Sequence, residues 1–178
     1  FHELHECRFR CPRGLSKSEF NEMRAEELIV SKWLNTTETL SLEKLKGKVI
    51  AIHAFQMLCP GCVLHGIPQA QRLFETFHPD FVSVLGLHTV FEHHEGMKEE
   101  SLKAFVHEFK VRFPVGIDEP SENNRIPKTM ELYQMQGTPT WLLINKDGEL
   151  KGHIFGQFDD LKLGAEIARM ALYGLPQN

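Results

Sequence analysis

Apolar positions along the chain follow two kinds of pattern, and the two kinds alternate. Residues 48–55 and 81–90 are nearly continuous β-prone apolar runs, which are typical of strands covered on both faces. Residues 60–77 and 99–110 instead carry apolar side chains at helical spacing, and Pro68 interrupts the first of these helices. The expected inner positions of the two helices are Leu64, Ile67, Leu73, Phe74 and Phe77, and then Leu102, Phe105, Val106 and Phe109.

The other patterned segments are shorter and complete the order of elements. A helical turn ended by Gly47 is expected over 41–47, and the Lys146-Asp147-Gly148 run between two β-prone stretches is a hairpin signal. Asp159 is the expected N-cap of an amphipathic helix. The remaining segments are a strand at 113–118, a helix at 127–135, the hairpin at 140–158 and the last helix at 159–174. This order predicts an α/β protein whose central mixed β-sheet is flanked by helices.

Composition and charge narrow the class of protein. The 178 residues are 42% hydrophobic and 25% charged, as in an ordinary globular domain, and the formal net charge of -4 gives no bias toward nucleic acid. We see no apolar run long enough for a membrane span. Four cysteines are too few for a disulfide-built scaffold. We expect residues 1–22 to be a polar extension or linker, with Met23 a candidate natural start, and residues 23–178 to form one domain.

Two of the cysteines lie in the run "FQMLCPGCVLHG", where a predicted strand ends and a helix begins. A thiol at a helix N-terminus meets unpaired N–H groups and the positive end of the helix dipole, and both stabilise a thiolate. Cys59 is therefore the expected nucleophile, and Cys62 lies close enough to attack a mixed disulfide on it. A zinc half-site and inert structural cysteines are the alternatives, although the sequence has no second C-x-x-C.

A second motif, "QGTPTWLLI" at 136–144, places Pro139 at the entry of a strand, where a cis peptide bond is an option. Together with the Cys-Pro-Gly-Cys run, this motif resembles the thioredoxin superfamily. The sequence is most similar to TlpA/ResA-type thiol-disulfide oxidoreductases and to the wider redoxin (AhpC-TSA-like) group. The likeness extends over about 26–174 and implies a thioredoxin-like fold.

The resemblance also implies roles for single residues. Cys59 would be the attacking thiol and Cys62 the resolving thiol, and the oxidised form would hold a Cys59–Cys62 disulfide. Pro139 would be a cis-proline that packs against the dithiol, and Thr138 would offer its backbone to a substrate chain. The implied partners are protein thiols or disulfides and a redox protein that recycles the dithiol. No cofactor, metal, nucleic acid or membrane span is expected.

Departures from the family pattern keep two other functions open. Leu58 stands where the family commonly has tryptophan, and Pro68 follows Cys59 by nine residues where thioredoxins typically have eight. The run "CVLHGIP" is also similar to peroxiredoxins, with Cys62 as the peroxidatic residue. That family places Thr or Ser where Cys59 stands and Pro where Phe55 stands, so peroxide reduction ranks second. A non-catalytic metal-binding module with a thioredoxin fold is the third hypothesis.

His53 precedes Cys59 by six residues, a position at which thioredoxins often carry a buried acid. Two-residue periodicity places it on one face of the strand with Val49, Ala51 and Phe55. A buried neutral imidazole there could accept the proton of Cys62. The alternative is a core histidine without catalytic duty.

Other candidate groups have weaker signals. His88, His93 and His94 could line the active-site face or bind a metal, although a solvated loop is the simpler interpretation. Cys7 and Cys11 follow two histidines near the N-terminus, and a zinc site, a local disulfide, a second redox pair and a flexible tail are all chemically reasonable. The compartment stays open: the absence of a visible export signal slightly favours the cytoplasm, whereas the resemblance favours the periplasm.

Overall fold

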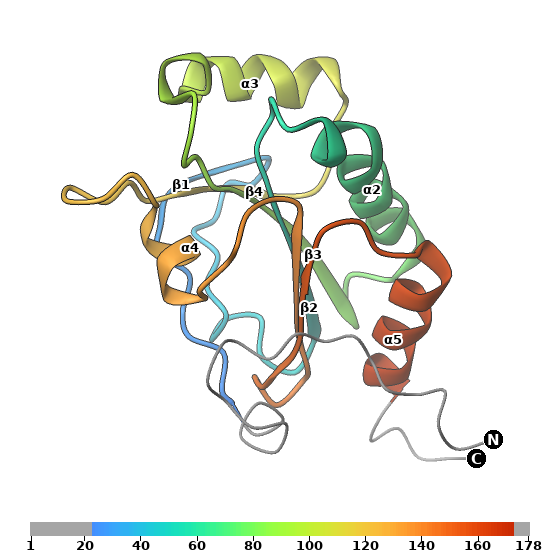
Figure 1. Ribbon diagram of the computed structural model, residues 1–178. Helices are drawn as coiled ribbons and strands as arrows, with labels where there is room; N and C mark the ends of the chain where they lie inside the picture. Colours follow the sequence, from blue (N-terminus) through green and yellow to red (C-terminus); the bar gives the residue numbers. More distant parts are fainter. Residues whose placement is uncertain (1–22, 173–178) are drawn as a thin grey trace.

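The computed structural model describes residues 23–172, which form a six-stranded mixed sheet with helices on both faces (Figure 1). The strand order is β1-β4-β3-β2-β5-β6. Strands β2, β3 and β4 run parallel, whereas β1, β5 and β6 are each antiparallel to a neighbour. Their bounds are β1 Val30–Leu34, β2 Val49–Phe55, β3 Val82–His88, β4 Val115–Asp118, β5 Thr140–Ile144 and β6 Leu150–Phe155.

Strand β2 is central, and all seven of its residues are buried. Alternate side chains therefore enter two separate hydrophobic clusters. Val49, Ala51 and Phe55 pack on the face covered by α2, α3 and α5, which we call the α2 face. Ile50 and Ile52 pack on the face covered by α4, which we call the α4 face. The helices are α2 Ile67–Thr76, α3 Glu99–Glu108, α4 Lys128–Leu132 and α5 Asp160–Leu172. Figure 1 shows α2 and α5 on one side of the sheet and α4 on the other.

This architecture confirms the predicted fold class, a central mixed sheet flanked by helices. Both continuous apolar runs are buried parallel strands, and the predicted hairpin is the β5–β6 pair. Gly148 in its turn has a φ of 82°, a conformation that favours glycine. Asp159 caps α5, because its Oδ1 accepts a hydrogen bond from the Lys162 N–H at 3.0 Å.

Several local expectations were wrong. No pattern had indicated the edge strand β1, whereas the helical turn expected over 41–47 is present as hydrogen-bonded turns, with the Leu45 N–H donating to the Ser41 carbonyl at 3.2 Å. Phe109 is the C-cap of α3 and is 54% exposed, and its ring stacks on Phe105 with centroids 4.4 Å apart. Leu64 is 69% exposed because the helix that holds it is not regular, as described below.

Some predictions concern residues outside the described range 23–172. The N-terminal extension 1–22, with Cys7 and Cys11, and the last two residues of the helix predicted over 159–174 lie outside the described residues. Within residues 23–172, no helix is both long and apolar enough to cross a bilayer.

Candidate active site

Cys59 and Cys62 lie just beyond the carboxyl end of β2, at the start of the helix that continues into α2. The turn Gln56–Leu58 joins strand to helix, and the Gln56 carbonyl accepts the Cys59 N–H at 3.1 Å. The backbone N–H of Cys62 donates to the Cys59 sulphur at 3.3 Å. An N–H directed at a sulphur stabilises negative charge on it. The helix start therefore supplies the environment expected for an attacking thiolate.

The two thiols differ sharply in accessibility. Both are free cysteines with their sulphurs 2.7 Å apart, and Cys59 is partly exposed whereas Cys62 is fully buried. Burial and, to a smaller extent, the hydrogen bond with Cys59 raise the pKa of Cys62 to about 12. Cys62 is consequently a protonated thiol near neutral pH, and Cys59 is the sulphur that solvent can reach.

The second sequence motif, residues 136–144, contacts the Cys-Pro-Gly-Cys motif beside Cys59. The Cys59 thiol donates to the Thr138 carbonyl at 3.6 Å. The Thr138–Pro139 peptide bond is cis, and a Cβ placed on Gly61 would lie 3.5 Å from Cδ of Pro139. The proline ring therefore packs directly on the short segment between the two cysteines. Thr138 and Pro139 are both partly exposed, so their backbone borders the accessible thiol.

A π-helical turn, η1 Cys62–Gly66, separates the dithiol from α2. Such turns hold one residue more than an α-helical turn and frequently occur at functional sites. The extra residue accounts for the nine-residue spacing between Cys59 and Pro68. Pro68 does not interrupt the helix, because it occupies the first turn of α2, where its missing N–H is tolerated. The same extra residue rotates the preceding positions, which explains why Leu64 faces solvent.

His53 lies on the α2 face under this π turn, and its side chain is fully buried. Its ring lies between those of Phe55 and Trp141, with centroid distances of 5.8 and 4.9 Å. An ideal Cβ on Gly66 would lie 2.2 Å from Nε2 of His53, so only glycine fits there. Neither ring nitrogen has a hydrogen-bond partner among the described residues. Burial lowers the pKa of His53 to about 3, which keeps the imidazole neutral.

Of the other candidate histidines, one is buried near the dithiol and the rest are exposed. His93 and His94 are exposed on the loop after β3, and His65 is exposed on the π turn. His88 is buried at the end of β3, where its Nε2 accepts the Met57 N–H at 3.5 Å. Within residues 23–172, no three His, Cys, Asp or Glu side chains are grouped so as to hold a metal ion.

Sequence reasoning missed Gln56, and it named His88 only as one of three histidines that could line the active-site face or bind a metal. Gln56 is buried, and its side-chain oxygen accepts the Phe91 N–H at 3.2 Å. These contacts join the loop after β3 to the turn before Cys59. A polar residue directly after a buried strand was the only available signal for Gln56.

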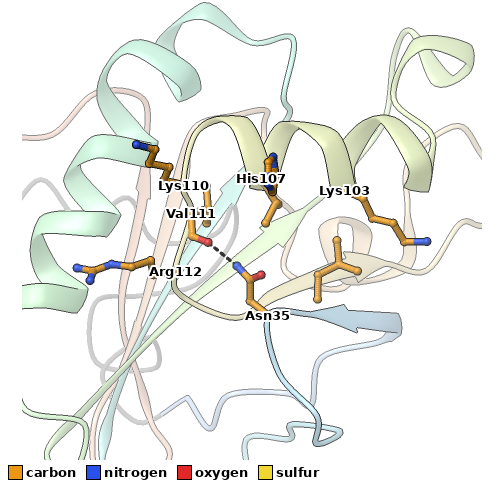
Figure 2. A pocket seen from close by; sticks show the side chains of 8 residues that line it. Asn35, Lys103, His107, Lys110, Val111 and Arg112 are labelled. Atoms are coloured by element: carbon orange, nitrogen blue, oxygen red, sulfur yellow. Dashed lines mark hydrogen bonds between the residues drawn. The ribbon is translucent and has the colours of Figure 1, made fainter.

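A cavity of about 410 Å³ lies between α3 and the end of β1, away from the dithiol residues (Figure 2). Its lining combines apolar side chains, among them Leu34 and Val106, with basic ones. Two of the lining cations are already paired with carboxylates, Lys103 with Glu99 and Glu100, and Arg112 with Glu75. Figure 2 shows both cationic chains directed away from the cavity, so it offers no focused anion site.

Comparisons with known proteins agree with this geometry. The chain matches the AhpC/TSA family over residues 24–153. It is 26% identical to the thiol-disulfide oxidoreductase ResA of Bacillus cereus over 118 residues, which cover 66% of this chain and 61% of the relative. The chain thus spans about three fifths of the length of that curated relative.

Solved structures give a closer likeness. A thioredoxin-like superfamily protein is 55% identical, with a TM-score of 0.83 over 86% of this chain and 99% of the other. A thiol-disulfide isomerase from Corynebacterium glutamicum is 46% identical, with a TM-score of 0.81 over 85% of this chain and 97% of the other. The chain belongs to the AhpC/TSA family and is a TlpA/ResA-like member of the thioredoxin superfamily.

Proposed function

We propose that this protein is a thiol-disulfide oxidoreductase that exchanges electrons with protein thiols through Cys59 and Cys62. One observation carries the proposal: an accessible and a buried thiol have their sulphurs 2.7 Å apart at a helix start, beside Thr138 and Pro139. The printed names of the similar proteins, a thiol-disulfide oxidoreductase and a thiol-disulfide isomerase, support the same chemistry.

The proposed reaction proceeds in two displacements. The Cys59 thiolate attacks a partner disulfide, which forms a Cys59–partner disulfide and releases one partner thiolate. Cys62 then loses its proton and attacks the Cys59 sulphur, which releases the second partner thiolate and forms the Cys59–Cys62 bond. The partner gains two electrons and two protons and the dithiol loses them. The reverse sequence oxidises a partner dithiol.

A protein, rather than a small molecule, suits the surface around Cys59. Leu58 and Leu64 flank the dithiol motif and are 57% and 69% exposed. Phe155 is 44% exposed, and its ring lies 3.0 Å from an ideal Cβ on Gly137, next to Thr138. Exposed apolar side chains beside a reactive group are typical of a contact surface. We infer that a polypeptide packs on this surface and pairs with the Thr138 backbone.

His53 is the candidate proton acceptor for Cys62 in the second displacement. Its neutral imidazole has a free lone pair, and it lies under the turn that begins at Cys62. With a pKa of about 3 it can pass a proton onward but cannot hold one, so we assign it a transient role.

Peroxide reduction is less well supported as an alternative. A peroxidatic cysteine must meet peroxide as a thiolate, whereas Cys62 is fully buried and its pKa is raised to about 12. Peroxiredoxins have a Thr or Ser hydroxyl that activates the peroxide, and Cys59 stands at that position here.

Reduction of insulin disulfides tests the proposal. The dithiol form should reduce insulin when a thiol reductant recycles it, and Cys59→Ser should abolish the reaction. Cys62→Ser should trap a mixed disulfide, visible by non-reducing mass spectrometry. Consumption of hydrogen peroxide without insulin reduction, with activity retained in Cys59→Ser, would replace the proposal with the peroxidase alternative.

A further inference from the structure

The turn Gln56–Leu58 carries the dithiol, and it is held by the loop that follows β3. The Gln56 side chain accepts the Phe91 N–H at 3.2 Å and donates to a carboxylate oxygen of Glu92 at 3.4 Å. At the strand ends, the Phe55 carbonyl accepts the Thr89 N–H at 3.0 Å. These bonds attach the end of β2 and the residue after it to the loop after β3, directly before Met57.

Met57 itself is held by a side chain. Its backbone N–H donates to Nε2 of His88, and both residues are buried. A buried N–H without an acceptor would cost free energy, so the acceptor matters for this turn. The His88 ring also packs on Phe55, with centroids 5.3 Å apart, which fixes the orientation of the lone pair.

We propose that His88 is a positioning residue of the dithiol. By accepting the Met57 N–H, it holds the turn whose Gln56 carbonyl accepts the Cys59 N–H, at the helix start where the Cys59 sulphur accepts the Cys62 N–H. The proposal rests on thiol-disulfide exchange as the proposed function. His88 touches no reacting sulphur, so its effect passes through Met57 and Gln56.

The protonation state of His88 agrees with this role. An imidazole accepts through Nε2 only while that nitrogen carries no proton. Burial lowers the pKa of His88 to about 4, so the acceptor is available at neutral pH.

We expect loss of the His88 acceptor to change the redox equilibrium of the dithiol more than the stability of the fold. The Cys59 sulphur accepts the Cys62 N–H at 3.3 Å, and this contact stabilises negative charge on the reduced Cys59 sulphur. A displaced turn would weaken that contact and favour the disulfide over the dithiol. Losing one neutral hydrogen bond changes an equilibrium by about three- to tenfold.

The test measures the equilibrium of the Cys59/Cys62 couple with glutathione, which needs no protein substrate. His88→Phe keeps a buried ring against Phe55 but removes the acceptor, whereas His88→Gln keeps an acceptor. His153→Phe is the matched control, because His153 is buried on the α4 face and Nε2 hydrogen-bonds the Tyr133 carbonyl at 3.0 Å. We expect the constant for reduction to fall about three- to tenfold in His88→Phe, and to stay near wild type in His88→Gln and His153→Phe.

Two results would overturn the inference. One is a wild-type constant in His88→Phe. The other is a shift of equal size in His153→Phe, which would mean that losing any buried histidine disturbs the couple. A wild-type protein with a measurable couple that reduces no protein disulfide would instead defeat the proposed function and leave the role of His88 standing.

Discussion

The buried histidines on the two faces of the sheet differ in their hydrogen bonds. On the α4 face, His153 is bonded through Nε2 to the Tyr133 carbonyl, as an ordinary core polar group is. On the α2 face, both ring nitrogens of His53 have no partner among the described residues, and His88 serves as acceptor for a backbone N–H next to the dithiol.

The difference shows where the chain keeps polar groups available for chemistry. A buried polar atom without a partner costs free energy, so a folded protein rarely retains one without a use for it. The α2 face holds such a group directly under the π turn that begins at Cys62, and the α4 face has only satisfied packing around its histidine. The predictions below test whether this contrast is functional.

The largest expected effect is a difference in alkylation rate between Cys59 and Cys62. Because burial raises the pKa of Cys62 to about 12, its thiol is protonated and unreactive toward alkylation at pH 7. Brief alkylation of the reduced protein, read by peptide mass spectrometry, should label Cys59 almost exclusively. Labelling of Cys62 at a similar rate would contradict the assignment of Cys59 as nucleophile.

The next prediction tests how tightly His53 is packed. Gly66→Ala would place a methyl group 2.2 Å from the imidazole, and we expect it to lower the free energy of unfolding by about 3 kcal/mol. Gly164→Ala in α5 is the matched control, since nothing lies within 4 Å of its ideal Cβ, and it should be neutral or stabilising by about 1 kcal/mol.

Combining Gly66→Ala with His53→Ala sharpens the test. Because the second substitution removes the clashing ring, the double variant should be less destabilised than the sum of the two single variants. Urea denaturation of all four proteins measures this coupling. Strict additivity would show that Gly66 and His53 do not touch in solution.

A smaller effect should appear in the pH dependence of stability. Burial lowers the pKa of His53 to about 3 and of His88 to about 4, below the value near 6.5 of an unfolded histidine. As pH falls below 6.5, the unfolded state binds protons that the folded state refuses, so stability is lost. Between pH 7 and pH 5 each histidine should contribute a loss of about 2 kcal/mol.

Chemical denaturation at pH 7 and pH 5 checks this expectation. His88→Phe should remove the contribution of His88, about 2 kcal/mol, to the loss of stability between pH 7 and pH 5. The pKa of His153 is lowered by burial too, but its hydrogen bond to Tyr133 opposes the shift, so His153→Phe should remove less. Identical pH profiles for wild type and His88→Phe would mean that His88 titrates normally in the folded protein.

The strands and the dithiol were predictable because their signals are local. Continuous apolar runs fix β2 and β3, and the Cys-Pro-Gly-Cys spacing places two sulphurs on one helical turn. The exposure of Leu64 was not predictable, because a π turn is set by how η1 packs over His53 and not by residue type. His88 was named only as one of three clustered histidines, and its contact was not predictable because its partner is a backbone N–H 31 residues away along the chain.

The smallest expected effect concerns proton transfer from Cys62. General-base assistance is typically worth about 10²- to 10⁴-fold, but a base with a pKa of about 3 is poorly matched to neutral pH. We therefore expect His53→Ala to slow resolution of the mixed disulfide by about tenfold and to leave its formation nearly unchanged. Stopped-flow kinetics separates the two steps, with Cys62→Ser as the trapped reference and His153→Ala as the control from the α4 face. If resolution is as fast in His53→Ala as in the control while the fold is intact, His53 is a core residue and the contrast between the two faces has no catalytic meaning at this position.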